Sequence, residues 1–288
     1  MVKILKNSRG DSSVMPILLI LIVSFFAITT ILVKQIDGNL IAMQKSRYEK
    51  AISMAINTSL ATVELSDDSN LEAISMGYTV HNQMMLDKTK LAKVFEDVLY
   101  RNVQAKSVYQ KNQFNQYIPL MGVLQNDRIS FLAYCGKDLE NPNSTTLTPW
   151  QDYPLYVHDE ADGKRIYLTL GDDYFTLIDE SIPWTTESNR NYDSLSNLNM
   201  TEKQKNELLY KVVKDDINSF ANTYKESHNH YTFTLRNFDK NSFLASINDV
   251  TVFCVVEGIP IKTILSNEPD KSFYMAKFGG ASLKRADQ

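Results

Sequence analysis

One uncharged apolar stretch near the N-terminus limits the fold of this chain more than any other feature. Residues 14–33 read VMPILLILIVSFFAITTILV and contain no charged side chain. In an α-helix, twenty residues rise about 30 Å, which matches the hydrocarbon thickness of a bilayer. A helix in a soluble core keeps a polar face for water, and a cleavable signal peptide has a shorter apolar region. We therefore expect a retained transmembrane helix over residues 14–33.

The charges that flank this stretch predict its orientation. The chain begins with residues 1–13, whose basic side chains are Lys3, Lys6 and Arg9. On the other side, Lys34 is soon followed by Asp37, so the positive charge there is weaker. Cytoplasmic flanks of transmembrane helices are enriched in Lys and Arg. We expect a single-pass protein of the cell membrane, with residues 1–13 as a basic cytoplasmic leader and the C-terminal domain extracytoplasmic.

The helix is expected to continue beyond the membrane. Apolar side chains recur at steps of three and four residues, which is the period of one helix face. They are Ile36, Leu40, Met43, Ala51, Ile52, Ala55, Ile56 and Leu60. Turn-forming residues follow at 67–70. The pattern predicts an amphipathic helical extension over residues 34–65, whose apolar stripe contacts either the following domain or a neighbouring subunit.

Residues 71–288 are expected to form one extracytoplasmic domain that contains two further helices. The first covers residues 87–104, with Asp87 as its N-cap. The second begins after Thr201, which has the capping-box spacing with Gln204, and continues to about residue 226. Apolar side chains at helical spacing line one face of each segment.

The other segments of this domain favour strands. Two apolar runs, 117–124 and 128–135, predict a hairpin around Asn126 and Asp127. A second hairpin is expected where a turn at Asp162 and Gly163 joins two further runs, 153–158 and 165–170.

Four shorter segments complete the predicted sheet, namely residues 174–178, 231–235, 250–256 and 273–278. The segment 250–256 is almost wholly apolar, as expected of a central strand. Residues 185–199 are rich in Ser, Asn and Asp and predict an exposed loop. Because helices and strands come in separate runs, we expect an α+β fold with a mostly antiparallel sheet.

Composition and charge exclude several functions. The chain has 288 residues, of which 43% are hydrophobic and 22% charged, with a net charge of -4. This acidic balance lacks the clustered Lys and Arg that nucleic-acid phosphates require, so no nucleic-acid partner is expected. No P-loop, dinucleotide-binding, Ser-hydrolase or zinc-protease motif occurs. We therefore predict no catalytic residues and no cofactor.

Histidines and paired carboxylates are the remaining candidates for chemistry. The four histidines are His81, His158, His228 and His230. Imidazole is a common zinc ligand, but nothing in this spacing requires a metal, so surface histidines are the simpler interpretation. Three acidic pairs begin at Asp67, Asp172 and Asp215. Each adjoins a predicted turn or a polar helix face, and solvated charge explains them without a metal site.

Two cysteines, Cys135 and Cys254, are present. Outside the cytosol they could form one disulfide, since oxidising compartments permit it. The alternative is a pair of buried thiols, because free cysteine is among the most buried residue types.

The N-terminus resembles those of class III-type prepilins and of TadE/TadF-like pseudopilins from tight-adherence pilus systems. The matching residues are the basic leader, Arg9 with Gly10, and the uncharged run that begins at residue 14. In that family a prepilin peptidase cuts after the glycine. The resemblance implies cleavage between Gly10 and Asp11. Met15 departs from the family, which commonly has a glutamate there, and this argues against a major filament subunit.

The following domain resembles membrane proteins of low-GC Gram-positive bacteria that are associated with such pilus systems. The similar segments are residues 117–120, 255–260 and 278–281. The resemblance implies a non-catalytic, pseudopilin-like component of a cell-surface pilus or secretion assembly. Its partners would be the membrane, a prepilin peptidase, and other subunits of the apparatus through the N-terminal helix. The alternatives are a membrane-tethered extracytoplasmic binding or sensory domain, and an anchored hydrolase without a recognised motif.

Overall fold

The computed structural model describes residues 11–64, 75–78, 84–133, 150–158, 165–227, 235, 238–264 and 272–281. These residues belong to two compact units. The N-terminal unit comprises Met1–Ser46 and Pro260–Lys271, and the main unit comprises Arg47–Ile259 and Ser272–Gln288.

A single helix, α1 (Asp11–Glu64), runs through 54 residues and contributes to both units. It covers the predicted transmembrane helix and almost the whole predicted extension, and it continues through Gly38. A Cβ added at Gly38 would meet nothing within 4 Å, so glycine is not required there by packing. The expectation of one long helix from the apolar stretch into the extension is confirmed.

The main unit contains a five-stranded sheet in the order β11-β10-β3-β4-β5. Its strands are β3 (Leu120–Gln125), β4 (Arg128–Leu132), β5 (Gln151–Pro154), β10 (Val250–Pro260) and β11 (Ser272–Ala281). The pairings from β10 across to β5 are antiparallel. The predicted hairpin around Asn126 and Asp127 is therefore confirmed, and the predicted strand 250–256 lies inside the sheet, between β11 and β3.

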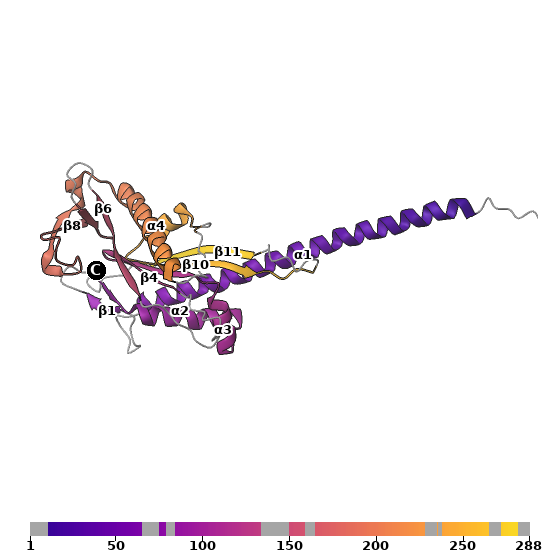
Figure 1. Ribbon diagram of the computed structural model, residues 1–288, viewed down its shortest axis with the longest axis horizontal. Helices are drawn as coiled ribbons and strands as arrows, with labels where there is room; N and C mark the ends of the chain where they lie inside the picture. Colours follow the sequence, from indigo (N-terminus) through magenta and orange to yellow (C-terminus); the bar gives the residue numbers. More distant parts are fainter. Residues whose placement is uncertain are drawn as a thin grey trace, which may run out of the picture. The chain divides into compact units, whose positions relative to one another are not determined.

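Both faces of this sheet are covered, which explains the unbroken apolar runs of β3 and β10. Figure 1 shows α4 (Glu202–Ser227) along one side of the strands and α2 (Lys88–Val103), with the last part of α1, on the other. Phe253 and Val255 pack with Leu209, Val213, Ile217 and Phe220 of α4 in one apolar cluster. The alternate residues of β10, Val252 and Cys254, are equally buried. A strand buried on both faces has no polar side to alternate with.

The predicted capping residues of both long helices are confirmed. The Asp87 carboxylate accepts a hydrogen bond from the Lys90 backbone N–H at the start of α2. Before α4, the Thr201 hydroxyl accepts from the Gln204 N–H, and the Gln204 side chain accepts from the Thr201 N–H. These bonds satisfy backbone donors that have no partner within the helix.

A second sheet has four antiparallel strands in the order β6-β7-β8-β9. They are β6 (Tyr156–His158), β7 (Arg165–Leu168), β8 (Asp173–Leu177) and β9 (Arg190–Ser194). One face joins the α4 cluster through Ile166, Leu168 and Tyr174. On the other face Tyr167 stacks on Phe175, with ring centroids 4.9 Å apart.

Two sequence predictions are wrong here. The expected strand 153–158 is divided at buried Leu155, so Tyr153 lies in one sheet and Tyr156 in the other. The segment 185–199 is largely exposed, as expected, but it is not a loop. It forms a 3-10 turn at Glu187–Asn189, strand β9, and a second 3-10 turn at Leu195–Leu198. Asn189, Arg190 and Leu195 of this segment are buried. The two polar side chains can be buried because Asn189 donates a hydrogen bond to a backbone carbonyl and Arg190 forms an ion pair.

Shorter elements were not predicted. They are β1 (Ser75–Tyr78), β2 (Met84–Leu86), α3 (Val108–Asn115) and α5 (Lys240–Ser246). The expected α+β class with antiparallel sheets is confirmed, with α3 and α5 in addition to the two expected helices. The predicted strand 231–235, except Leu235, and the turns at 67–70 and at Asp162 and Gly163 lie outside the described residues.

Candidate functional site

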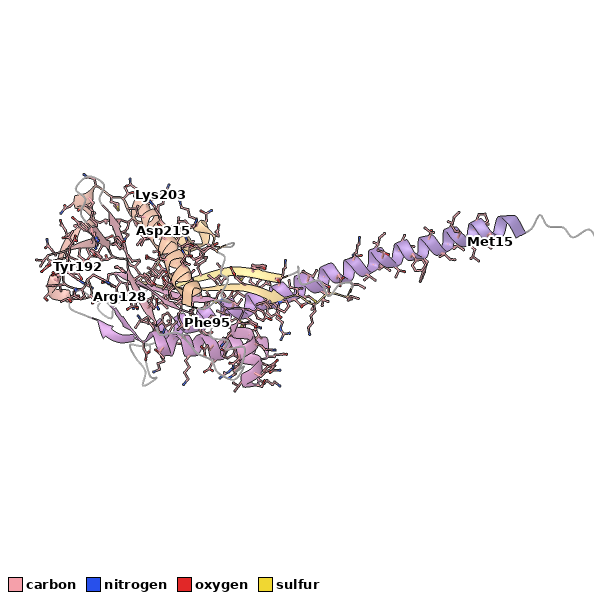
Figure 2. All side chains as sticks on the ribbon, in the orientation of Figure 1. Met15, Phe95, Arg128, Tyr192, Lys203 and Asp215 are labelled. Carbon is pink, nitrogen blue, oxygen red and sulfur yellow. The ribbon has the colours of Figure 1, made fainter. Side chains whose placement is uncertain are left out.

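The first half of α1 is the most unusual surface of the described chain. Between Met15 and Leu32, every large apolar side chain is exposed, namely Met15, Ile17, Leu18, Leu19, Ile20, Leu21, Ile22, Val23, Phe25, Phe26, Ile28, Ile31 and Leu32. Figure 2 shows Met15 near the start of this stretch. Leaving each of them in water costs about 1.5 kcal/mol or more, so the total cost is on the order of 20 kcal/mol. This cost favours apolar surroundings for the helix over water.

The length and composition of α1 are those of a membrane-spanning helix. It is the one such helix found in the described part of the chain, and its most apolar stretch is not buried inside the protein. Its polar groups are satisfied locally: the Thr29 and Thr30 hydroxyls donate to the carbonyl oxygens of Phe25 and Phe26, both at 2.8 Å. A helix in lipid must satisfy its polar groups internally, because the hydrocarbon offers no hydrogen-bond partner. We conclude that the chain has one candidate membrane-spanning helix near its N-terminus.

Just beyond the apolar stretch, α1 binds a short segment that follows β10. The Gln44 amide donates to the carbonyl of Lys262 at 2.8 Å and accepts from the Lys262 backbone N–H at 3.0 Å. Asp37 accepts a hydrogen bond from the Ile264 N–H at 2.5 Å. Asp37 is only 5% exposed, although it belongs to an otherwise exposed part of the helix. These contacts hold residues 262–264 along one face of α1.

The last turns of α1 instead belong to the apolar core of the main unit. Ala51, Ile52, Ala55, Ile56 and Leu60 are all buried. A Cβ added at Gly279 of β11 would lie 2.5 Å from Ile56, so this strand and the helix are in close contact. The C-terminal half of the predicted apolar stripe is thus confirmed, whereas Ile36 and Met43 are exposed.

A buried ion-pair network joins the two sheets. Asp127, at the β3–β4 turn, is fully buried and accepts a hydrogen bond from Nε of Arg128 at 2.8 Å. Nη2 of Arg190 in β9 lies 2.8 Å from the other carboxylate oxygen, as an ion pair that lacks hydrogen-bond alignment. The turn also accepts two backbone hydrogen bonds, from Leu155 to Asp127 and from Leu170 to Asn126. The turn is therefore the docking point of the second sheet.

Charged groups around this turn are matched to one another. Figure 2 labels Arg128 and Tyr192 in this region. The Arg190 guanidinium donates to the Tyr192 hydroxyl and lies over the Phe175 ring, 4.5 Å from its centroid. Burial alone would raise the pKa of Asp152, but hydrogen bonds from Lys88 and Ser130, with nearby positive charge, bring it below its ordinary value. This mutual pairing is what a structural network requires.

A second carboxylate, that of the half-buried Asp216, has no cation paired with it in this way. Asp216 lies on α4, and its Oδ2 is buried without a hydrogen bond. Burial, and secondarily the charge of Asp215, raises the pKa of Asp216 to about 7. Burial raises the pKa of Tyr153, and the negative charge of ionised Asp216 raises it further. Unpaired buried carboxylates lower stability when they ionise.

The candidate site residues from the sequence are only partly described. Gly10 precedes the described residues, and Asp11 is the first residue of α1. Cys254 is fully buried in β10, and burial raises the pKa of its thiol. Cys135 lies outside the described residues, so both the leader cleavage and the disulfide stay predictions.

Among the histidines, only the backbone of His158, in β6, belongs to the described chain. His81, His228 and His230 lie outside it. The described residues contain no group of three or more His, Cys, Asp or Glu side chains that could hold a metal ion. Of the acidic pairs, Asp173 accepts a hydrogen bond from the Thr169 hydroxyl, and Asp215 is exposed on α4.

Sequence patterns missed the contacts between α1 and residues 262–264 and the pairing of Asp127 with Arg190. Their partners are far apart in the chain, and isolated Asp, Gln or Arg residues carry no periodic signal. No family model, curated protein or solved structure matches this chain.

Proposed function

We propose that this chain is a non-catalytic, pseudopilin-like component of a cell-surface pilus or secretion assembly, similar to TadE/TadF-like proteins. One observation carries the proposal: α1 is exposed and apolar on all sides over its first half, yet forms part of a folded core over its last turns. The same helix can therefore lie in lipid or against other helices while it holds a globular domain.

The physical requirement for such a subunit is an apolar surface all round the helix. This surface does not distinguish a subunit from an ordinary anchor, because both kinds of helix must be stable in lipid. What a subunit needs in addition is a helix that continues into its domain. Burial of Ile52, Ile56 and Leu60 supports this, because these side chains lie within the main unit.

The proposed orientation has residues 1–13 in the cytoplasm and the α+β domain outside. The support is the basic leader, since flanking Lys and Arg favour the cytoplasmic side. The proposed partners are the membrane, a prepilin peptidase that cuts after Gly10, and other subunits of the apparatus that contact α1.

Two features of the described chain favour a structural role over catalysis. The buried charges Asp127 and Arg190 are directed at each other. The exposed large apolar side chains are concentrated on α1, with thirteen between Met15 and Leu32. Both features favour assembly through the helix rather than chemistry in the domain.

Cross-linking along α1 tests the proposal. Single cysteines would replace exposed residues such as Leu18, Ile20 and Phe25 in the full-length chain, in a Cys135→Ser background and in its native membrane. A pseudopilin-like subunit gives covalent multimers whose yield rises and falls every three or four residues, because one helix face contacts the neighbour. Leu18 and Phe25 share a face and should behave alike, whereas Ile20 lies on the other side.

A uniform absence of cross-links at all positions, with the protein still in the membrane fraction, would contradict the assembly role. That result would instead favour a tethered binding or sensory domain with an isolated anchor. Protease treatment of intact cells checks the orientation separately, because an extracytoplasmic domain is degraded from outside while the N-terminal end of α1 is protected.

A further inference from the structure

We propose that residues 261–264 form a second contact with the membrane, in which the Ile264 side chain lies at the boundary between lipid headgroups and acyl chains. The proposal rests on the membrane anchoring of α1 that is part of the proposed function. The contact of residues 261–264 would be a membrane-binding surface in addition to the spanning helix α1.

The position of this segment along α1 is set by three hydrogen bonds within the N-terminal unit. Two join Gln44 to the backbone of Lys262, at 2.8 and 3.0 Å. The third joins the Ile264 N–H to Asp37 at 2.5 Å. Going from Lys262 to Ile264, the chain therefore passes from the level of Gln44 to the level of Asp37. This direction is toward the apolar stretch of the helix.

The height of each contact above the lipid follows from the helix rise. The uncharged stretch ends at Val33, and at 1.5 Å per residue Asp37 lies about 6 Å beyond it, whereas Gln44 lies about 16 Å beyond it. The headgroup region adds about 5 to 8 Å on each side of the hydrocarbon core. Ile264, which is bound to Asp37, is thus at the level of the headgroups, and Lys262 is above them.

The side chains at this level suit a lipid surface. Ile264 is 62% exposed, and Ile36 on α1 is 52% exposed. Amphipathic protein surfaces bury such apolar side chains about 5 to 10 Å into the boundary between headgroups and acyl chains. Lys34 and Lys262 are exposed and positively charged, which favours contact with anionic headgroups.

Among the described residues at this level of α1, Asp37 is the acidic group that could oppose this contact, and it is buried. Its side chain is 5% exposed and its carboxylate accepts the Ile264 N–H, so it does not face the headgroups. A carboxylate so close to the membrane would otherwise repel anionic lipid. The same hydrogen bond therefore positions Ile264 and shields the charge.

Depth-dependent fluorescence quenching tests the proposal on the full-length chain. Ile264→Trp would be reconstituted in vesicles of phosphatidylcholine and phosphatidylglycerol, with and without a phosphatidylcholine brominated near the headgroup end of its acyl chains. Phe26→Trp is the control for the span, and Met43→Trp is the matched exposed position farther along α1. The unaltered chain supplies the background of Trp150 and Trp184.

We expect Ile264→Trp to be quenched by brominated lipid more than Met43→Trp. If Phe26→Trp is quenched and Ile264→Trp is quenched no more than Met43→Trp, the second contact is wrong while the anchor stands. If Phe26→Trp is not quenched either, the proposed membrane anchoring itself fails. The two failures are thus distinguished by one control.

A second set of variants tests the role of the hydrogen bonds. Asp37→Ala with Gln44→Ala removes the side-chain partners of residues 262 and 264. In this background we expect the quenching of Ile264→Trp to fall toward that of Met43→Trp, because the segment is no longer held at the headgroup level. Unchanged quenching would show that these bonds do not position Ile264 and would overturn the proposal in this form.

Discussion

Nη2 of Arg190 lies 2.8 Å from Oδ2 of Asp127, and both side chains are at most 1% exposed. The pair joins the first residues of β9 to the turn between β3 and β4, so it connects the two sheets of the main unit. Arg128 shares the same carboxylate through its Nε. The Asp127 carboxylate is shielded from water, so it depends on the positive charges of Arg128 and Arg190 to remain ionised in the folded protein.

Replacement of Asp127 by Asn should therefore strongly destabilise the main unit. The substitution removes the buried counter-charge of Arg190 and leaves it only the exposed Glu187 carboxylate, 3.2 Å from its Nη1. We expect a loss of about 3 to 5 kcal/mol in the free energy of unfolding. Urea unfolding of the full-length chain in detergent, followed by near-UV circular dichroism, measures it. The matched control is Glu207→Gln, which breaks the exposed pair with Lys240 and should cost less than about 1 kcal/mol. Equal costs for the two variants would contradict the structural role of the network.

Because the pKa of Asp216 is raised, we expect the stability of the protein to depend on pH in an unusual way. The folded-state pKa of Asp216, about 7, lies above that of an unfolded carboxyl group, so the folded state holds its proton longer. Asp216 therefore does not lower the free energy of unfolding below about pH 4. The free energy of unfolding falls as the pH rises from about 4 to about 7, and it stays lower above about pH 7. Asp216→Asn removes this penalty and should stabilise the protein at about pH 8 by roughly 1 to 2 kcal/mol, allowing for its partial exposure.

Melting temperatures of the unaltered chain and Asp216→Asn across this pH range check that expectation. Asp215→Asn is the matched control, because it removes only the secondary effect of the neighbouring charge. It should retain most of the pH dependence. A stability gain for Asp216→Asn that is the same at about pH 4 and about pH 8 would show that ionisation is not the cause.

The contact between α1 and β11 predicts a coupled pair of substitutions. Gly279→Ala adds a Cβ that would lie 2.5 Å from the Cγ2 of Ile56, so we expect a loss of about 1 to 3 kcal/mol. In an Ile56→Ala background this clash is absent, and the cost of Gly279→Ala should shrink. A double-mutant cycle of unfolding free energies measures the coupling. Strictly additive costs would mean that the two residues do not meet in the folded protein.

Cleavage of the leader is tested by the mass of the membrane-bound protein. If a prepilin peptidase cuts between Gly10 and Asp11, Gly10→Leu blocks the cut and the protein retains residues 1–10. We expect a heavier chain for Gly10→Leu than for the unaltered protein, by intact-mass spectrometry. Lys6→Gln is a control that alters the leader away from the cut. An unaltered chain that starts at Met1 would refute the cleavage.

The reactivity of Cys254 distinguishes the two hypotheses for the cysteines. In the folded protein Cys254 is buried and its pKa is raised, so it should resist alkylation. After unfolding without reductant, two buried or free thiols give two labels, whereas a disulfide between Cys135 and Cys254 gives none. Mass spectrometry of the labelled chain counts them.

Much of the fold could be predicted because its signals are local. The uncharged stretch 14–33, the N-cap Asp87 and the capping box of Thr201 and Gln204 each act within a few residues, so composition and spacing were sufficient. The segment 185–199 failed for the opposite reason. Its Ser, Asn and Asp residues indicate a loop, but pairing with β8 and the burial of Arg190 against Asp127 make it a strand.

The order of the residues is enough to predict a strongly apolar helix and an α+β domain, because helix periodicity and hydrophobicity are properties of neighbouring residues. Three features are visible only in the folded chain: which residues of the helix are buried, the binding of residues 262–264 by Asp37 and Gln44, and the contact of Asp127 with Arg190. These contacts join residues as many as 227 positions apart. Their formation depends on how the strands pair and pack, which no local pattern specifies.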